Sequence, residues 1–222
     1  MNLLTLDPGS STGYCLARLS LDEKNNYDKA DIYEYGHIDV DLSSNFQGDH
    51  CLDLMNKIKI LIEHHKITHI AIEDYFFSKR FCNGSNVNAA FRTAIHILAR
   101  QNNIEYTILN ISSWKTFVAG RATPTKEQKV KWGVEPSKKL YIQQALWDTY
   151  SFRFPNHSLS TNTKKPIAFR LDNVDVVGQT VYYCGMICGI RKDKITMSFV
   201  PPEDVVWKKQ PKKTFVYEDK NN

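Results

Sequence analysis

Two acidic residues open a segment with the spacing of a buried helix, LDNVDVVGQTVYY. Asp172 and Asp175 lie three positions apart, so their carboxylates project from one helix face, where like charges destabilise a helix unless something compensates. A divalent cation would compensate, which makes both residues candidate metal ligands. The alternative is structural, because acids in a first helical turn are favoured by the helix dipole.

A third acid, Asp7, stands at the end of the apolar run 3–6, which is typical of a buried strand. Pro8-Gly9 then favours a tight turn, and the apolar run 13–17 predicts the second strand of a hairpin. We therefore expect Asp7 at the end of the first strand. Asp-Pro-Gly is also a common turn sequence, so this acid alone does not identify a site.

A fourth acid, Glu73, directly follows the apolar run 68–72. Core packing does not explain an acid at this place, and strand-terminal acids in α/β sheets tend to lie in the crevice at the carboxyl edge. The alternative is an exposed strand end. Together with Asp7, Glu73 is thus a candidate for a site at the edge of the sheet.

The segment 75–81, YFFSKRF, interleaves four aromatic residues with two cations. Phe76 and Phe77 are candidates to stack on unpaired bases, while Lys79 and Arg80 are candidates to hold phosphates. The alternative is that some of these rings are buried. Beside a carboxylate site, such a loop favours nucleic-acid binding.

A basic segment, residues 115–139, carries seven basic residues and two acids, which equals the whole net charge of +5. Such a concentration beside aromatic residues is what a phosphate backbone selects for, although a solvated basic loop is the alternative. Glycine and proline interrupt residues 114–135, which predicts a loop with at most short helical pieces. The candidate phosphate contacts are Lys115, Arg121, Lys126 and Lys138.

Hydrophobic periodicity elsewhere predicts alternating helices and strands, and therefore an α/β fold. Further strands are expected at 30–40, 68–72 and 105–109, and helices at 53–65, 87–100, 136–150 and 172–188. The strand, helix, strand order from 68 to 109 implies a parallel pair with a right-handed crossover. The polar stretch 151–170 is expected to be either an ordered functional loop or a disordered insertion.

The 222-residue chain is 42% apolar, which suffices for a core of its own. No apolar run approaches the roughly 18 residues that span a bilayer, and the N-terminus lacks the pattern of a signal peptide, so we expect no membrane contact and a cytoplasmic location. Five widely spaced cysteines predict reduced core thiols. Cys184 and Cys188 lack the additional ligands of a zinc site.

Four segments taken together resemble the RuvC family of Holliday junction resolvases, of which this chain would be a divergent member: LTLDPGSSTGY, IAIEDYFF, SSWKTFVAGR and LDNVDVVGQTVYY. None is specific alone, but their order and context extend over most of residues 1–190. The resemblance implies an α/β, ribonuclease H-like fold with a mixed five-stranded sheet flanked by helices. It also implies a homodimer that binds branched DNA and resolves four-way junctions in a Mg²⁺-dependent reaction.

Carried over by motif, the resemblance makes the metal-binding carboxylates Asp7, Glu73, Asp172 and Asp175. They would hold two Mg²⁺ ions, for which Mn²⁺ can substitute, and Phe76 would contact bases at the junction centre. The catalytic lysine of the family precedes a helix as Lys-x-x-Val. Lys139-Leu140-Tyr141-Ile142 fits this spacing, while Lys126 lies nearer the glycine loop, and we favour Lys139.

The chain also departs from the family pattern. Residues 121–135 and 151–170 look like insertions in a nuclease domain at 1–190, and 191–222 would be a C-terminal extension. Asp7 to Gly13 also resembles the phosphate loop of actin-like and sugar-kinase ATPases, but 222 residues leave too little chain for their second half. A related nuclease acting on other branched DNA would also fit this sequence, as would a non-catalytic nucleic-acid-binding module.

Overall fold

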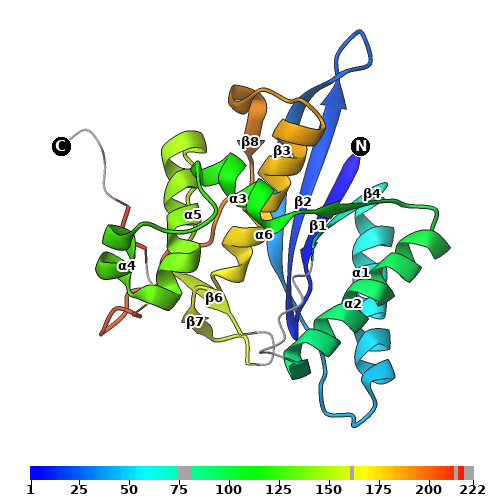
Figure 1. The fold of residues 1–222 in the computed structure, drawn as a ribbon, viewed down its shortest axis with the longest axis horizontal. Helices are drawn as coiled ribbons and strands as arrows, with labels where there is room; N and C mark the ends of the chain where they lie inside the picture. Colours follow the sequence, from blue (N-terminus) through cyan, green and yellow to red (C-terminus); the bar gives the residue numbers. More distant parts are fainter. Residues whose placement is uncertain (75–81, 161–162, 213–214, 218–222) are drawn as a thin grey trace.

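Six strands form one mixed sheet in the order β5-β4-β1-β2-β3-β8 (Figure 1). The strands are β1 (Asn2–Asp7), β2 (Ser11–Leu21), β3 (Tyr27–Asp39), β4 (His69–Glu73), β5 (Glu105–Leu109) and β8 (Ile195–Met197). The first three form an antiparallel meander, and β4 and β5 add in parallel on the other side of β1. This computed structural model describes residues 1–74, 82–160, 163–212 and 215–217, with side chains at 82–86 left out.

The strand period of two explains why both faces of the sheet are covered. Along β1, Leu3 belongs to one buried cluster, whereas Leu4 and Leu6 belong to another on the opposite face. The same alternation puts Ala17 and Leu16 of β2 into different clusters. A strand that is apolar on both faces must lie at the centre of a sheet between two helical layers.

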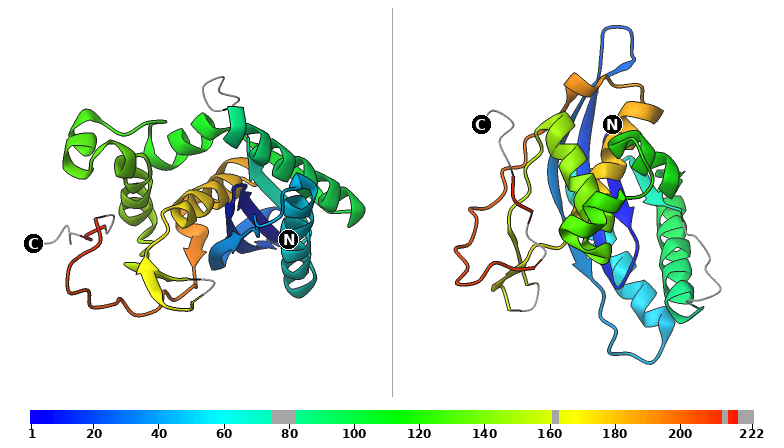
Figure 2. Two further views of the ribbon diagram at one scale, coloured as in Figure 1. Left: turned by 90° about the horizontal axis from the view of Figure 1, so that it is seen from below. Right: turned by 60° about the vertical axis from the view of Figure 1, so that its left-hand side comes forward.

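Two helical layers enclose this sheet (Figure 2). The helices are α1 (Gln47–His65), α2 (Cys82–Gln101), α3 (Ile111–Ala119), α4 (Lys126–Trp132), α5 (Val134–Tyr150) and α6 (Asp172–Tyr182), which a π-helical turn continues over Tyr183–Ile187. Helices α1 and α2 cover one face, while α6 lies across β1, β2 and β3 on the other face with α3 and α5 packed against it. Among the described residues, no helix is long and apolar enough to cross a bilayer.

The basic segment is more helical than its glycine and proline content predicts. Helix α3 begins at the Asn110 cap, which accepts a hydrogen bond from Ser113 N, and ends at Gly120 with φ +70°. Helix α4 begins with a capping box in which Thr125 and Gln128 exchange hydrogen bonds. The stretch 114–135, predicted as a loop with at most short helical pieces, thus contains the seven-residue α4 and most of α3. Capping residues favour both helices, and the buried Trp114 and Val118 also favour α3.

Residues 151–170 contain a short hairpin, β6 (His157–Leu159) and β7 (Pro166–Ala168), rather than a wholly irregular loop. The C-terminal stretch also contributes to the sheet, because β8 pairs in parallel with β3. The sheet thus has one strand more than the five predicted. The proposed boundary near residue 190 stays a prediction.

The cysteines whose side chains the structure describes, Cys15, Cys51, Cys184 and Cys188, are free thiols, as predicted. Cys15 and Cys184 lie in the core, whereas Cys51 and Cys188 are only partly buried.

Candidate active site

Asp7 and Glu73 lie side by side at one edge of the sheet. Strands β1 and β4 are parallel and pair Leu6 with Ile72, so the residue that ends each strand reaches the same edge. Burial, followed by the charge of Glu73, raises the pKa of Asp7 well above its usual value. Burial, followed by the charge of Asp175, likewise raises the pKa of Glu73. Ionising both carboxyls is therefore costly unless a cation is near.

The first turn of α6 brings Asp172 and Asp175 to the same place. Gly13 of β2 pairs with Asp7 across the hairpin, and a Cβ at Gly13 would lie 3.0 Å from a methyl of Val176 and 3.3 Å from the carbonyl oxygen of Asp172. Any side chain at position 13 would therefore require α6 to shift by a few tenths of an ångström. The approach places helix-borne acids over the end of β1.

Lys139 of α5 lies between the two helix-borne acids. Its Nζ is 2.5 Å from Asp172 Oδ1 and 2.6 Å from Asp175 Oδ2. Burial alone would lower the pKa of Lys139, but the charges of Asp175, Asp7 and Asp172 raise it above its usual value. The other candidate lysine, Lys126, is exposed at the start of α4 and makes no such contact.

Trp114 of α3 is a site residue that the sequence analysis missed. Its indole Nε1 donates a 2.9 Å hydrogen bond to Glu73 Oε1, and the ring is fully buried. A Cβ at Gly178 of α6 would lie 2.9 Å from the Trp114 ring, so the indole fits only because position 178 is glycine. The signal in the sequence was an aromatic residue with a polar edge next to Lys115, on an otherwise apolar helix side.

The residues present fit a divalent metal, although Lys139 now binds two of the acids. Among the described residues, no three acidic, histidine or cysteine side chains are arranged as a ready metal cage. However, Asp175 Oδ1 is buried and has no hydrogen-bond partner, and such an atom strongly favours a cation. Carboxylate oxygens are also the ligands that Mg²⁺ prefers. The carboxylate oxygens, together with the unpaired Asp175 Oδ1, thus suit a hard cation.

Two hollows flank the acids. One of about 230 Å³ is lined by Asp7, Pro8, Glu73, Asp74, Asn88, Arg92 and Ile111. The other, of about 460 Å³, lies between α5 and the residues that precede α6, and its lining includes Lys138, Lys139, Arg170 and Asp172. The acids therefore lie between two concave surfaces, as a site for an extended chain requires.

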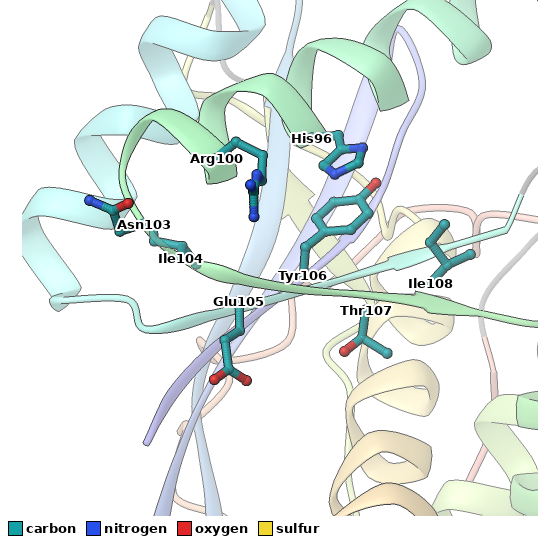
Figure 3. Close-up of a pocket in the computed structure, with 8 residues that line it drawn as sticks. All are labelled: His96, Arg100, Asn103, Ile104, Glu105, Tyr106, Thr107 and Ile108. Atoms are coloured by element: carbon teal, nitrogen blue, oxygen red, sulfur yellow. The ribbon is translucent and has the colours of Figure 1, made fainter.

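A larger hollow of about 890 Å³ lies elsewhere, along the outer edge of β5 (Figure 3). There the ring of His96 on α2 stacks on Tyr106, with centroids 4.5 Å apart. None of the four candidate metal ligands lines this hollow. The volume of a hollow alone therefore does not identify the candidate active site.

The predicted DNA contacts are placed only in part. Lys115 lies 5.1 Å from the centroid of the Trp114 ring, and Lys138 forms a 2.7 Å ion pair with Glu135 on the exposed side of α5. Arg121 and Lys126 are exposed between α3 and α4. The four candidates in the aromatic segment, Phe76, Phe77, Lys79 and Arg80, lie outside the described residues.

Comparison with known proteins gives agreeing results from sequence and from structure. A family model described as crossover junction endodeoxyribonuclease RuvC matches residues 3–140. Crossover junction endodeoxyribonuclease RuvC of Sulfurovum sp. (strain NBC37-1) is 34% identical over 134 residues, which are 58% of this chain and 76% of that protein. Asp172 and Asp175 lie beyond the range of the family model.

Two solved structures share the fold at low sequence identity. The Thermus thermophilus RuvC structure has a TM-score of 0.53 and 14% identity, covering 85% of this chain and 98% of that chain. The structure of T. thermophilus RuvC in complex with a Holliday junction substrate has a TM-score of 0.55 and 13% identity, covering 85% and 97%. The predicted ribonuclease H-like α/β fold class is confirmed. Since the family model spans more than half of the chain and the curated relative is matched over three quarters of its length, the chain belongs to the RuvC family of crossover junction endodeoxyribonucleases, which are metal-dependent nucleases.

Proposed function

We propose that this protein is a Mg²⁺-dependent endonuclease that resolves four-way DNA junctions by paired, symmetric nicks. One observation carries the proposal: β1, β4 and α6, far apart in the sequence, bring three carboxylates around Lys139 and a fourth, that of Glu73, beside Asp7. Core packing does not require so many like charges in one place, and their repulsion costs stability. A shared cation would offset this repulsion and so explain why the acids are clustered.

Asp7, Glu73, Asp172 and Asp175 would hold two Mg²⁺ ions, with Mn²⁺ able to substitute. Bound in this way, such ions activate water and stabilise the leaving oxygen in phosphodiester hydrolysis. The protein contributes the fixed geometry: Trp114 orients Glu73, and the glycine at position 13 lets Asp172 approach Asp7. Lys139 holds a positive charge beside the acids, where it would stabilise negative charge developing on phosphate.

The DNA would lie across both hollows, with the basic residues of α3 to α5 on its phosphates. The cations proposed for this role are Lys115, Arg121, Lys126 and Lys138. The aromatic segment that follows Glu73, with Phe76, Phe77, Lys79 and Arg80, is proposed to contact unpaired bases at the junction centre. One of the relatives with this fold is described in complex with a Holliday junction substrate, which supports this choice of partner.

One active site cuts one strand, so paired cuts need two sites related by a two-fold axis. We therefore propose a homodimer, matched to the two-fold symmetry of a four-way junction. The alternative within the same chemistry is a nuclease for other branched DNA.

Cleavage of a set of end-labelled DNAs in Mg²⁺ tests the proposal. The set contains a four-way junction, a three-way fork and a linear duplex of the same sequence, and Asp7→Asn protein is the control for contaminating nuclease. We expect two opposed nicks in the junction, far slower cutting of the duplex, and a dimer in sedimentation. A monomer that cuts duplex as fast as junction would be a nuclease but not a resolvase. Junction binding without any metal-dependent cleavage would leave only a binding module.

A further inference from the structure

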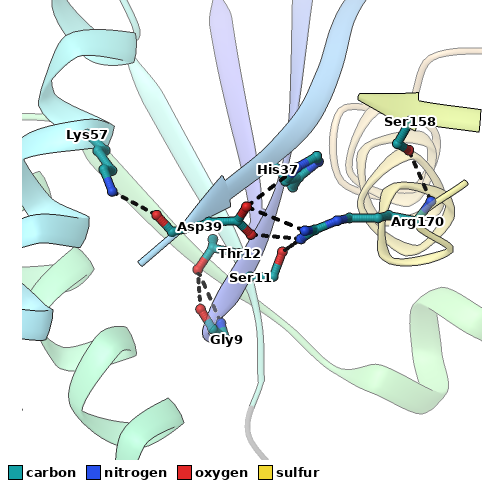
Figure 4. A network of polar contacts seen from close by, with 8 residues as sticks. All are labelled: Gly9, Ser11, Thr12, His37, Asp39, Lys57, Ser158 and Arg170. Carbon is teal, nitrogen blue, oxygen red and sulfur yellow. Dashed lines mark hydrogen bonds and ion pairs between the residues drawn. The ribbon is translucent and has the colours of Figure 1, made fainter. Parts of the chain in front are cut away.

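A polar network around Arg170 connects three parts of the chain (Figure 4). Arg170 Nη1 lies 2.7 Å from Asp39 Oδ1 at the end of β3, and it also donates to the Ser11 hydroxyl. Arg170 Nη2 lies 3.4 Å from Asp39 Oδ2, so the arginine faces both carboxylate oxygens. The pair is largely enclosed, with 26% of the Arg170 side chain and 29% of the Asp39 side chain exposed.

The backbone of Arg170 belongs to the start of α6. Its carbonyl oxygen accepts a 3.1 Å hydrogen bond from the amide of Asn173, and its own amide donates 3.1 Å to the Ser158 hydroxyl in β6. Arg170 precedes Asp172 by only two residues. Any displacement of this backbone would therefore move the helix-borne acids.

Ser11, at the other end of the contact, belongs to the turn that follows Asp7. Within that turn Thr12 Oγ1 donates 2.7 Å to the carbonyl oxygen of Gly9 and accepts 3.2 Å from its amide, which fixes the turn. Ser10 O accepts a hydrogen bond from Val40 N, so the turn is also bound to the end of β3. The side chain of Arg170 thus reaches a rigid turn that is continuous with Asp7.

Asp39 is itself held in place from a third direction. Lys57 Nζ of α1 donates 2.7 Å to the carbonyl oxygen of Asp39 and forms a 2.7 Å ion pair with Asp53. The network therefore anchors the first turn of α6 to the end of β3 and, through it, to α1.

We infer that Arg170 is a positioning residue, which sets the spacing between the strand-borne acid Asp7 and the helix-borne acids Asp172 and Asp175. This inference rests on the proposed function. Residues 7 and 172 are far apart in sequence, and the Arg170 side chain binds Ser11, four residues after Asp7, while its backbone lies two residues before Asp172. Metal ligands must be held to within a fraction of an ångström. Groups bonded directly to metal ligands govern metal affinity about 10- to 100-fold, and Arg170, which acts through the backbone beside them, is expected at the lower end of this range. A partly exposed ion pair contributes little to global stability, so the functional effect should be the larger one.

Metal binding by the DNA-free protein tests the inference. Calorimetric titration with Mn²⁺ gives the affinity, and melting in EDTA gives stability. We expect Arg170→Met to weaken Mn²⁺ binding about 10-fold or more while the melting temperature in EDTA falls only slightly. The absence of DNA excludes an effect through lost phosphate contact. Arg153→Met, which breaks the 3.0 Å Arg153–Asp204 pair remote from the acids, is the control and should leave Mn²⁺ affinity unchanged.

Two milder variants separate positioning from folding. Ser11→Ala removes only the contact with the turn and should weaken Mn²⁺ binding in the same direction, by less. Arg170→Lys, which keeps the charge and loses the two-oxygen geometry, should be intermediate. The inference is overturned if Arg170→Met lowers the melting temperature but binds Mn²⁺ as the wild type does, or, should that variant not fold, if Ser11→Ala and Arg170→Lys both bind as the wild type does. Wild-type protein that binds no Mn²⁺ would instead contradict the proposed function.

Discussion

The strand-borne acids and the helix-borne acids are held in opposite ways. Asp7 and Glu73 are placed by backbone register in adjacent parallel strands, and burial raises the pKa of both carboxyls. Asp172 and Asp175 belong to a helix end, and each receives a hydrogen bond from Lys139. Strand pairing thus fixes the positions of Asp7 and Glu73, but among the described residues no cation forms an ion pair with either carboxylate. Lys139 neutralises the charges of Asp172 and Asp175, whose positions depend on side-chain contacts.

This difference predicts which substitutions should alter the geometry of the site and which should alter its electrostatics. Backbone register in the centre of a sheet resists substitution, so changes near the strand-borne acids should alter electrostatics more than geometry. Besides the packing of α6 on the sheet, the helix-borne acids are held by side-chain contacts from α5 and from the Arg170 network, so changes there should alter geometry as well. The following predictions separate the two behaviours, beginning with the largest effect.

Loss of any one carboxylate should have the greatest effect. Asp7→Asn, Glu73→Gln, Asp172→Asn and Asp175→Asn each keep the volume of the side chain and delete a metal-ligand charge. We expect junction cleavage to fall by about 10²–10³-fold or more, with junction binding nearly intact. Single-turnover cleavage beside gel-shift affinity measures both. Glu63→Gln, which changes an exposed acid on α1, is the control. Near-full activity in any two of the four variants would remove the four-carboxylate site.

Lys139→Met should distinguish the two pairs most clearly. It leaves Asp175, whose side chain is only 6% exposed, without its 2.6 Å cation, which is expected to cost about 1–3 kcal/mol in metal-free protein. Cleavage should fall by about 10²-fold, since a charge near the phosphate is lost. Mg²⁺ should raise the melting temperature of the variant more than that of the wild type, because a cation then replaces the ammonium. Equal shifts in both proteins would mean that the lysine and the metal do not share these acids. Lys24→Met, which changes an exposed lysine in the turn between β2 and β3, is the control.

Trp114→Phe should have a smaller effect, confined to the strand-borne pair. The phenyl ring keeps the base of the side chain, but it loses both the 2.9 Å donor to Glu73 and the outer indole carbons that face Gly178, so some loss of packing accompanies the lost hydrogen bond. The loss of one hydrogen bond to a charged group corresponds to about 1.5–3 kcal/mol, so we expect roughly a 10-fold increase in the Mg²⁺ concentration for half-maximal cleavage. Trp147→Phe, on α5 beside Tyr217, is the control. An unchanged Mg²⁺ requirement would show that register alone positions Glu73.

The sequence predicted the strand-borne half of the site more completely than the helix-borne half. The apolar runs that end in Asp7 and Glu73 predict where these acids lie, because side chains alternate between the two faces of a strand. Once the buried faces are known, the register and the strand ends are largely determined. The i, i+3 spacing of Asp172 and Asp175 predicted that they share a helix face, and α6 begins at Asp172 as expected. Lys139 was favoured through resemblance, and the structure brings it to both acids.

What the sequence did not reveal depends on contacts between distant side chains. Trp114 was the first residue of the stretch predicted as a loop, and its bond to Glu73, 41 residues earlier, arises only in the folded protein. Arg170 lay in a stretch without periodicity, and its partner Asp39 is more than a hundred residues away. The sixth strand was missed as part of the sheet because three residues, Ile195–Met197, carry too little pattern to show which edge they join.

The pH dependence of stability is the smallest effect and tests the electrostatic side of the comparison. The pKa of Asp7 is raised in the folded protein, so above the ordinary carboxyl pKa of about 3.9 the folded state binds more protons than the unfolded state, and the stability of metal-free protein falls as the pH rises through this window. Asp7→Asn removes this loss, so in EDTA the variant should melt above the wild type at pH 7.5. A gain of about 1 kcal/mol would correspond to about 2–4 °C and should vanish near pH 4.

Asp41→Asn is the matched control with the opposite sign. A hydrogen bond from the Ser43 amide lowers the pKa of Asp41, which favours the folded state above the unfolded pKa, so this substitution should not raise the melting temperature at pH 7.5. Saturating Mg²⁺ should reverse the order of wild type and Asp7→Asn, because only the wild type then has its full set of ligands. If Asp7→Asn melts at or below the wild type in EDTA across pH 4–8, the charge of Asp7 does not destabilise the metal-free protein. The proposed electrostatic difference between the strand-borne and helix-borne acids would then be wrong.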